Sequence, residues 1–404
     1  MTPFSCGQCG QTVFFENTAC GACGATLGFL PGELRLVAFA SLPPGPGPWL
    51  ACGSHDGQWL QPCANRVQYG ACNWLLDAGD TLALCRSCRL TQTLPPLAEP
   101  GNLDRWRVFE QAKRRLVYTL ISLGLPPQPK AQADDFAGLA FRLLATLPGD
   151  GQVLTGHDDG VITVNIDECD DVQRETTRVA MGEPVRTLLG HLRHETAHYL
   201  QYRYIDGTPA QARCREVFGD ESAGYAAALQ RHYDNGPPAN WQTHHVSPYA
   251  SAHPWKDWAE TCAHYLLVVD AVQVVAAWGL ALSGPAAAVP MAPDQVNAAP
   301  IGELVLQQWL PVARFLNAMN RSLGLRDSYP FQLSDVVLAK MGTVQEMLQQ
   351  ARRAETPQAA ADPVPRPAPQ RTPQRTPQPA TQPATHPATL PAAQAAPSTQ
   401  EATA

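Results

Sequence analysis

The spacing of apolar residues changes along the chain, and in most of the central part the apolar residues follow a helical period. Between residues 106 and 123, apolar side chains recur every three or four positions until Gly124 and Pro126 stop the pattern, as in an amphipathic helix. Similar patterns predict further helices at residues 136–147, 184–204, 221–232, 255–282, 301–323 and 333–352. The central part of the chain is therefore expected to be mainly α-helical.

One central segment has a different period. Residues 161–166 alternate, are rich in β-branched side chains and follow an Asp159-Gly160 turn, which predicts a strand or hairpin among the helices. The most apolar stretch, residues 265–283, contains Asp270 and Gln273. These polar residues favour a buried helix over a membrane span, so we predict no transmembrane segment.

The two ends of the chain differ from its centre. Residues 1–95 are rich in Cys, Gly and Trp, and turn signals break their short apolar runs, so we expect a small loop-and-strand module held by metal. Residues 355–404 consist mostly of Pro, Ala, Thr and Gln, and such a segment cannot offset its ordering entropy. We therefore predict an α+β chain: a module at 1–95, a mainly α domain at 100–352, and a disordered tail at 355–404.

Composition narrows the class of function. The chain has 29 basic and 36 acidic residues and a net charge of −7, which disfavours nucleic acid as a partner. Its first residues lack the features of a secretory signal, so we expect a cytoplasmic protein. Nine of the twelve cysteines lie in the first 88 residues. In a reducing compartment, CxxC spacing indicates metal ligands rather than disulfides.

The amino-terminal cysteines fall into two sets of four. The first set has the two-knuckle spacing of a structural zinc site, and the second includes one further CxxC pair. No thioredoxin-like βαβ pattern surrounds them, which disfavours a redox dithiol. Cys52 belongs to neither set, and it is either a substitute ligand or a free buried thiol. The three later cysteines are expected to be small buried side chains. The two sets are Cys6, Cys9, Cys20 and Cys23, then Cys63, Cys72, Cys85 and Cys88.

The motif His194-Glu195-Thr196-Ala197-His198 carries the candidate chemistry. On a helix, positions i and i+4 share a face, so His194 and His198 can bind one zinc ion with Glu195 beside them. Zinc lowers the pKa of a bound water toward neutrality, and Glu195 would take the remaining proton as general base. This arrangement predicts peptide hydrolysis.

A catalytic zinc needs a third protein ligand and an open fourth position. Glu260 is favoured, because its apolar neighbours suit a buried helix with one inward carboxylate and His264 follows four residues later. Glu221 is the alternative, since it lies nearer to His198 in sequence. Tyr249 is a candidate oxyanion donor, although a structural role is an equal alternative. His191 is expected to be a partly buried, hydrogen-bonded histidine.

The chain resembles a bacterial family of zinc-binding, zincin-like metallopeptidases with an amino-terminal zinc ribbon. The resemblance spans residues 4–350 and implies a glutamate as third zinc ligand. At one position the chain departs from the family pattern: Lys256 stands where an acidic residue is expected before Asp257, which is a further reason to favour Glu260. The segments that carry the family resemblance are GEPVRTLLGHLRHE at 182–195, CNWL at 72–75, CRSCRL at 85–90, GHDDGVIT at 156–163, AHPW at 252–255 and NAMNRSLG at 317–324.

Two functions follow from these features. The first is hydrolysis of a peptide or protein substrate by a zinc-bound water, with one catalytic and one or two structural zinc ions and with the strand at 161–166 pairing with the extended substrate. The second is a zinc-dependent binding or scaffold protein whose ribbon engages a partner protein and whose HExxH site is catalytically idle. The sequence leaves both open.

Overall fold

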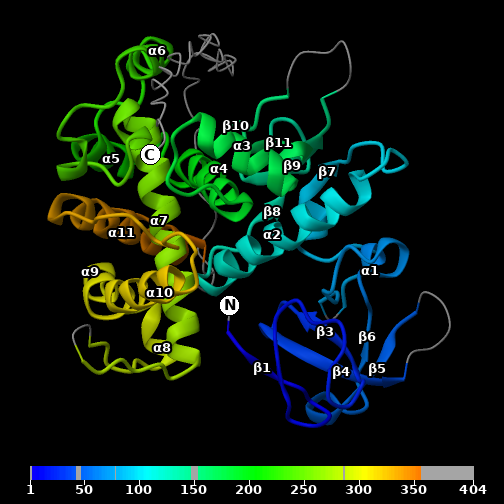
Figure 1. The fold of residues 1–404 in the computed structure, drawn as a ribbon. Coiled ribbons are helices and arrows are strands. Elements are labelled where there is room, and N and C mark those ends of the chain that lie inside the picture. The colour runs from blue at the N-terminus through cyan, green and yellow to red at the C-terminus, as the bar shows by residue number, and fades with distance from the viewer. Residues whose placement is uncertain (1, 42–46, 78, 147–152, 285–286, 356–404) are drawn as a thin grey trace, which may run out of the picture.

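The computed structural model describes residues 2–41, 47–77, 79–146, 153–284 and 287–355 of the chain. The predicted tail at 355–404 lies outside the described residues, apart from Glu355. In Figure 1 the strands of the amino-terminal module lie at the lower right, below α2 and the other helices of the domain. This order of a cysteine-rich module followed by a mainly helical domain is the predicted one.

The amino-terminal module consists of short antiparallel strands. A two-stranded ribbon of β1 and β2 precedes a four-stranded sheet in the order β3-β4-β5-β6. Their bounds are β1 (Phe4–Ser5), β2 (Thr12–Val13), β3 (Thr26–Leu30), β4 (Arg35–Ser41), β5 (Trp49–Cys52) and β6 (Trp59–Leu60), followed by helix α1 (Ala64–Tyr69).

A second sheet lies within the larger domain, in the order β10-β11-β9-β7, with β8 paired to β9. Strand β9 corrects the predicted helix at 136–147. It is almost entirely buried and lies parallel to both of its neighbours in the sheet, and such a strand has a continuous apolar sequence. The bounds are β7 (Thr91–Thr93), β8 (Gln128–Pro129), β9 (Gly138–Leu144), β10 (Gly156–Asp158) and β11 (Val161–Asn165).

The alternating segment forms β11, as the sequence predicts, but β11 is not the edge of the sheet. Among the described residues, β10 is the end strand and separates β11 from solvent on that side. If an extended polypeptide pairs with this side of the sheet, it must therefore pair with Gly156–Asp158 and not, as the sequence predicts, with residues 161–166.

Helices make up most of the remaining domain. The predicted helix at 221–232 is found as α6, which begins four residues later, and α5 is an additional helix before it. The predicted helix at 301–323 contains a π-helical segment, η6 (Leu304–Trp309), between α9 and α10. The helices are α2 (Asn102–Ser122), α3 (Asp171–Ala180), α4 (Leu188–Tyr204), α5 (Ala210–Phe218), α6 (Tyr225–Asn235), α7 (Pro254–Ala277), α8 (Pro293–Val296), α9 (Ile301–Glu303), α10 (Leu310–Ser322) and α11 (Asp335–Glu355).

Helix α7 is the one helix of the described chain that is long and apolar enough to cross a membrane. Of its most apolar window, 78% is buried inside the protein. The burial of α7 matches the predicted core helix.

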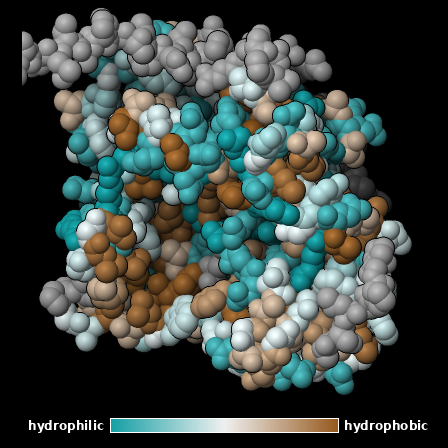
Figure 2. Space-filling model, turned by 45° about the vertical axis from the view of Figure 1, so that its right-hand side comes forward, coloured by the Kyte–Doolittle hydropathy of each residue, from teal (hydrophilic) through white to brown (hydrophobic). Residues whose placement is uncertain are grey.

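Apolar side chains also gather on the surface, at the lower left of the face in Figure 2, beside a hollow.

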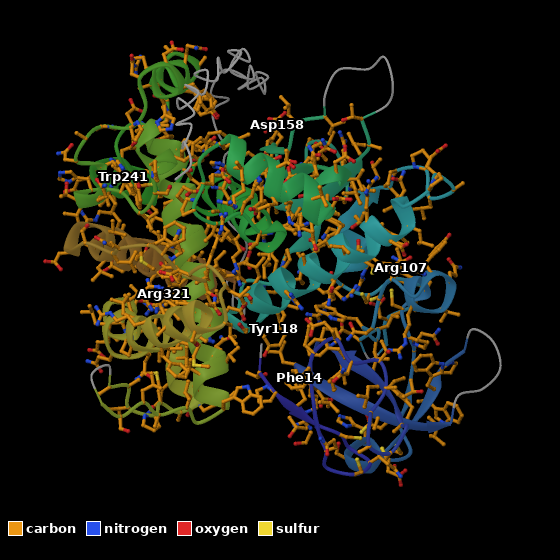
Figure 3. The ribbon with its side chains drawn as sticks, viewed as in Figure 1. Phe14, Arg107, Tyr118, Asp158, Trp241 and Arg321 are labelled. Atoms are coloured by element: carbon orange, nitrogen blue, oxygen red, sulfur yellow. The ribbon has the colours of Figure 1, made fainter. Side chains whose placement is uncertain are left out.

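Aromatic side chains join the amino-terminal module to the helices. Phe15 and Phe29 of the module lie 5.4 and 5.8 Å from the ring of Tyr118 on α2, and Phe14 stacks 6.5 Å from Trp278 after α7. Phe14 and Tyr118 accordingly meet at the junction in Figure 3. The two parts share one hydrophobic core, so the module is packed onto the domain rather than tethered to it.

Helix α4 begins at Leu188, not near Pro184 as predicted. The residue before it, Thr187, has extended backbone angles, and its side chain accepts a hydrogen bond of 3.0 Å from the backbone N–H of Gly190. This is an N-cap, which satisfies one of the unpaired N–H groups of the first turn.

We expect Thr187→Ala to lower the free energy of unfolding by about 1 kcal/mol, because the cap is lost from the helix that carries the motif. Thermal or urea unfolding measures the change, and Thr187→Ser is the matched control because its hydroxyl keeps the cap. An equal loss in both variants would contradict the capping role of Thr187.

Candidate metal centres and HExxH site

Each predicted set of four cysteines comes together in the structure, and the sulfur atoms of each set lie within 4.8 Å of one another. The Sγ–Sγ distances of the pairs Cys6–Cys23, Cys9–Cys20 and Cys72–Cys85 are 3.8, 3.7 and 3.7 Å. Tetrahedral Zn–S bonds of about 2.3 Å place neighbouring sulfurs about 3.8 Å apart. Both clusters therefore fit a structural zinc ion.

Cys52 lies in neither cluster. It is buried at the end of β5, and burial raises the pKa of its thiol, as do the nearby charges of Cys6 and Asp56. Of the two readings left open for Cys52, the structure favours a buried thiol outside the metal sites.

The second cluster, of Cys63, Cys72, Cys85 and Cys88, lies against charged side chains of α2. The Cys88 thiol donates to Glu110 at 3.7 Å, and the ammonium of Lys113 lies 2.7 Å from the same carboxylate. Burial alone would lower the pKa of Arg114, but the negative charges of Cys72, Cys88 and Glu110 raise it. Cationic groups of α2 thus balance the charge of a four-thiolate site.

The HExxH residues all lie on α4, and the three that carry the chemistry are buried. Helix α7 packs against this helix, where the indole N–H of Trp258 donates to the carbonyl of Ala197 at 2.9 Å. This contact fixes the register between α4 and α7. It brings the first turns of α7 beside His194 and His198.

Glu260 of α7 contacts His194, but not on the side that faces His198 and Lys256. Its Oε1 lies 2.6 Å from Nδ1 of His194, and its Oε2 accepts a hydrogen bond of 2.6 Å from Ser247. Burial would raise the pKa of Glu260, but these contacts lower it to about 2. A carboxylate accepts only, so His194 is held with its proton on Nδ1 and its Nε2 lone pair free for another group.

Lys256 lies on the other side of the two imidazoles. Its Nζ is 3.5 Å from Nε2 of His194 and 3.3 Å from Nε2 of His198. With Zn–N bonds of about 2.0–2.1 Å, two nitrogen ligands of one tetrahedral zinc lie about 3.3–3.4 Å apart. The ammonium therefore stands where a third ligand would stand, if the two Nε2 atoms held a zinc ion.

These residues do not fit a catalytic zinc. A protonated lysine has three N–H donors and no lone pair, so it cannot serve as a ligand, and its charge repels a divalent cation. The prediction of Glu260 as third ligand is corrected by its position: it binds Nδ1 of His194, the nitrogen opposite the one that faces Lys256. The residue that breaks the family pattern is thus at the centre of the site.

Glu195, the predicted general base, is paired with His191 of the preceding turn. Nε2 of His191 lies 3.3 Å from Oε1 of Glu195, and its Nδ1 lies 2.5 Å from Glu168. Burial would lower the pKa of His191, but the two carboxylates raise it to about 10. The prediction that His191 is a partly buried, hydrogen-bonded histidine agrees with these contacts.

The other candidates lie at different distances from the motif. Tyr249, in η5 (Tyr249–Ala252), has its ring 6.0 Å from that of His194, and burial raises the pKa of its phenol, which keeps it a hydrogen-bond donor. Its role as an oxyanion donor stays a prediction. Glu221 is bound to Arg215 at 2.7 Å and to Gln211 at 2.8 Å. These contacts explain its burial without a metal.

His157 is a neighbour of the motif that sequence reasoning missed. It lies on β10, its ring centroid is 6.5 Å from that of His198, and it accepts from the backbone N–H of Gly160 at 3.1 Å. Burial lowers its pKa to about 4. The sequence signals for it are its place before the Asp159-Gly160 turn and within GHDDGVIT at 156–163, one of the segments that carry the family resemblance.

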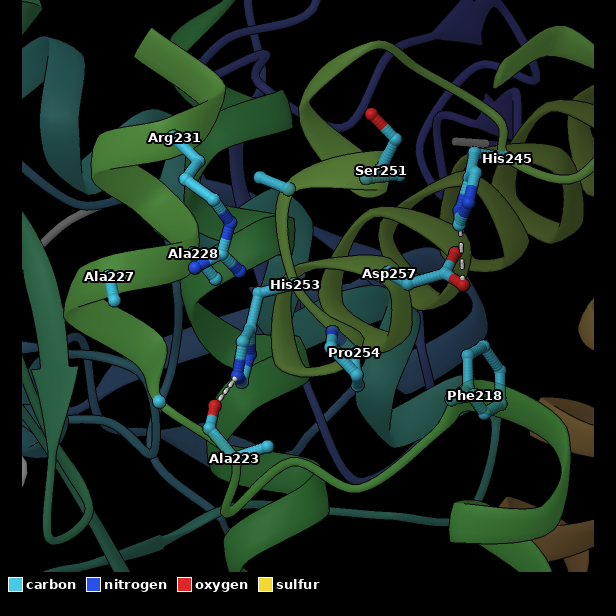
Figure 4. Close-up of a pocket in the computed structure, with 13 residues that line it drawn as sticks. Phe218, Ala223, Ala227, Ala228, Arg231, His245, Ser251, His253, Pro254 and Asp257 are labelled. Carbon is cyan, nitrogen blue, oxygen red and sulfur yellow. Dashed lines mark hydrogen bonds and ion pairs between the residues drawn. The ribbon is translucent and has the colours of Figure 1, made fainter. Parts of the chain in front are cut away.

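A cavity of about 330 Å³ lies beside the first turn of α7. In Figure 4 its wall carries Arg231 of α6, His253, whose ring donates to the carbonyl of Ala223, and Asp257, which faces His245. Most of the remaining lining is alanine and other small side chains. A volume of this size is at the lower end of the range of ligand-binding pockets.

The comparisons with known proteins agree with this architecture. Residues 3–99 match a model described as a zinc-ribbon domain, and residues 102–347 match a model described as "Putative zinc-binding metallo-peptidase". Proteins of Mycobacterium bovis and Mycobacterium tuberculosis, each named an uncharacterized protein, are 43% identical over 346 residues, which cover 84% of this chain and 93% of theirs. No solved structure matches the chain. The chain therefore belongs to the zinc-binding metallopeptidase family that carries an amino-terminal zinc ribbon.

Proposed function

We propose that this chain is a zinc-stabilised polypeptide-binding protein, built on the metallopeptidase fold, in which the HExxH centre does not hydrolyse peptides. One observation carries the proposal: the ammonium of Lys256 lies 3.3 and 3.5 Å from the two imidazole nitrogens of the motif. Of the two functions that the sequence leaves open, this geometry favours the second.

The surroundings of Glu195 also disfavour a general base. Burial would raise its pKa, but the hydrogen bond from His191 and the charge of Lys256 lower it well below the usual range. A carboxylate with so low a pKa takes up a proton poorly at neutral pH. Its side chain is stabilised as an anion in an ion pair.

The edge strand next to the motif supports polypeptide binding. Strand β10 packs on α4, and within the described residues it pairs with β11 alone, so an added strand would pair with its other edge. Asp158, at its end, lies at the surface in Figure 3. An extended peptide added to this edge would run past His157 and over the motif.

Peptide hydrolysis is the second candidate, and one observation favours it. Glu260 contacts Nδ1 of His194, and so supports a histidine of the motif as a second-shell carboxylate does at a zinc site. Hydrolysis would require Lys256 to leave the site or to bind zinc as a neutral amine.

We expect the zinc-loaded wild-type protein to cleave neither an unfolded protein nor a mixed peptide library above the buffer rate, and Glu195→Gln to change nothing. Mass spectrometry of the digests measures cleavage, and fluorescence anisotropy measures binding of the same peptides by both proteins. Cleavage by the wild type that Glu195→Gln abolishes would establish the peptidase instead.

A further inference from the structure

We infer that the ammonium of Lys256 takes the place of the third protein ligand beside the two imidazoles of the HExxH helix, so that the motif binds no zinc until this one residue is changed. The inference rests on the proposed function and deepens it, because it names the group that closes the site. Three features of the described residues carry it.

The first is the environment of the charge. Lys256 is buried, and a buried cation is costly unless it is compensated. Its Nζ lies 4.9, 5.3 and 5.9 Å from the ring centroids of Trp255, Tyr249 and Tyr225, within the range of cation–π attraction. These rings and the anionic Glu195 make a site that suits a cation.

The second is the orientation of the two imidazoles. Glu260 and Ser247 hold His194 so that its Nε2 can only accept, and an ammonium proton is a suitable donor to that lone pair. Trp255, the neighbour of Lys256, stacks on His198 with ring centroids 3.7 Å apart. The two histidines are thus held in the arrangement that a metal would need, but the ammonium of Lys256 donates to their Nε2 atoms instead.

The third is the position of Lys256 on the fold. It lies in the first turn of α7, one turn before Glu260, and the contact between Trp258 and Ala197 fixes this turn against α4. A glutamate side chain at this position is one bond shorter than lysine. Its carboxylate could supply the oxygen ligand, with Zn–O of about 2.0–2.2 Å, that an ammonium cannot supply.

Zinc counting by plasma mass spectrometry tests the inference without reference to cleavage. We expect two zinc ions per wild-type chain, both in the cysteine clusters, and three in Lys256→Glu. Lys256→Met, which removes the charge but adds no ligand, should keep two. Arg314→Glu is the matched control because it makes the same charge change at an exposed position of α10 and should also keep two.

Histidine variants locate the additional ion. In the Lys256→Glu background, His198→Ala should return the count from three to two, whereas in the wild type His198→Ala should leave the count unchanged. Three zinc ions in the wild type, with one lost on His198→Ala, would overturn the inference even if Lys256→Glu fails to fold. A folded Lys256→Glu protein with only two zinc ions would overturn it as well.

The two proposals can fail separately. A wild-type protein with three zinc ions and no peptide cleavage would contradict the closed site but leave the binding function standing. A wild-type protein with two zinc ions whose cleavage of peptides depends on Glu195 would contradict the proposed function and leave the metal-free site standing.

Discussion

Replacing Cys85 with serine is expected to remove one zinc ion per chain and to unfold the amino-terminal module. Cys85 is fully buried in the second cluster, where its sulfur lies 3.7 Å from that of Cys72. Structural zinc contributes about 10–16 kcal/mol to the folding of small zinc-finger peptides, and serine is a poor ligand. The loss is therefore comparable to the whole net stability of an ordinary domain, about 5–15 kcal/mol.

Three measurements follow this loss. Zinc content should fall by one ion, and the fluorescence of Trp74 should change, because this buried indole packs on Phe15 and Phe29 within the module. Limited proteolysis should cut within the first 95 residues. Cys52→Ser is the control, since Cys52 is buried in the same module but belongs to neither cluster. A variant Cys85→Ser that keeps its full zinc content would show that the cluster is not a metal site.

The cysteine clusters could be predicted from sequence because their geometry is local. Two CxxC knuckles bring four sulfurs together over a short loop, as at Cys6, Cys9, Cys20 and Cys23, and little of the remaining fold enters the argument. The chemistry of thiolate ligands and the spacing between them decide the site. In the second set, α1 and the loops around it bring Cys63 and Cys72 together despite their wider spacing in sequence.

Strand β9 could not be predicted from apolar periodicity. Residues 138–144 read GLAFRLL, and the strand is buried between β11 and β7, so both of its faces require apolar side chains. A run of this kind lacks the alternation of a half-exposed strand and resembles a short buried helix. In contrast, β11 alternates between buried and half-buried positions and was predicted correctly.

The third position of the motif could not be decided from sequence either. Lys256 and Glu260 lie four residues apart, so they share one face of α7 and both can reach α4. An imidazole has two ring nitrogens on opposite sides, and a carboxylate can bind either of them. Only the placement of α7 on α4 shows that Glu260 meets Nδ1 of His194 and that Lys256 meets Nε2.

The same placement explains why the residue at position 256 matters to the proposal. A lysine on the solvent face of a helix would change the net charge and little else. Here its Nζ is within 3.5 Å of both motif histidines, in a buried site. In our proposal, this one residue separates the metal chemistry of the motif from the fold that carries it.

The second large effect is expected from Lys113→Met, which should lower the free energy of unfolding by about 3–5 kcal/mol. Lys113 and Glu110 form an ion pair of 2.7 Å on α2, and both side chains are fully buried. Removing the ammonium leaves the carboxylate of Glu110 uncompensated, beside the thiolates of the second cluster. Both the lost attraction and the added repulsion act against folding.

Urea unfolding, followed by tryptophan fluorescence, measures this change. The exposed pair of Arg213 and Glu216 on α5, at 2.7 Å, provides the control, since Arg213→Met should cost no more than about 1 kcal/mol. The double variant Lys113→Met with Glu110→Leu should recover at least half of the loss, because it removes the buried charge as well as its partner. If Lys113→Met lowers the free energy of unfolding as little as Arg213→Met does, then Lys113 does not compensate the negative charge of Glu110 and the second cysteine cluster. Arg114 would then balance the charge of this cluster without Lys113.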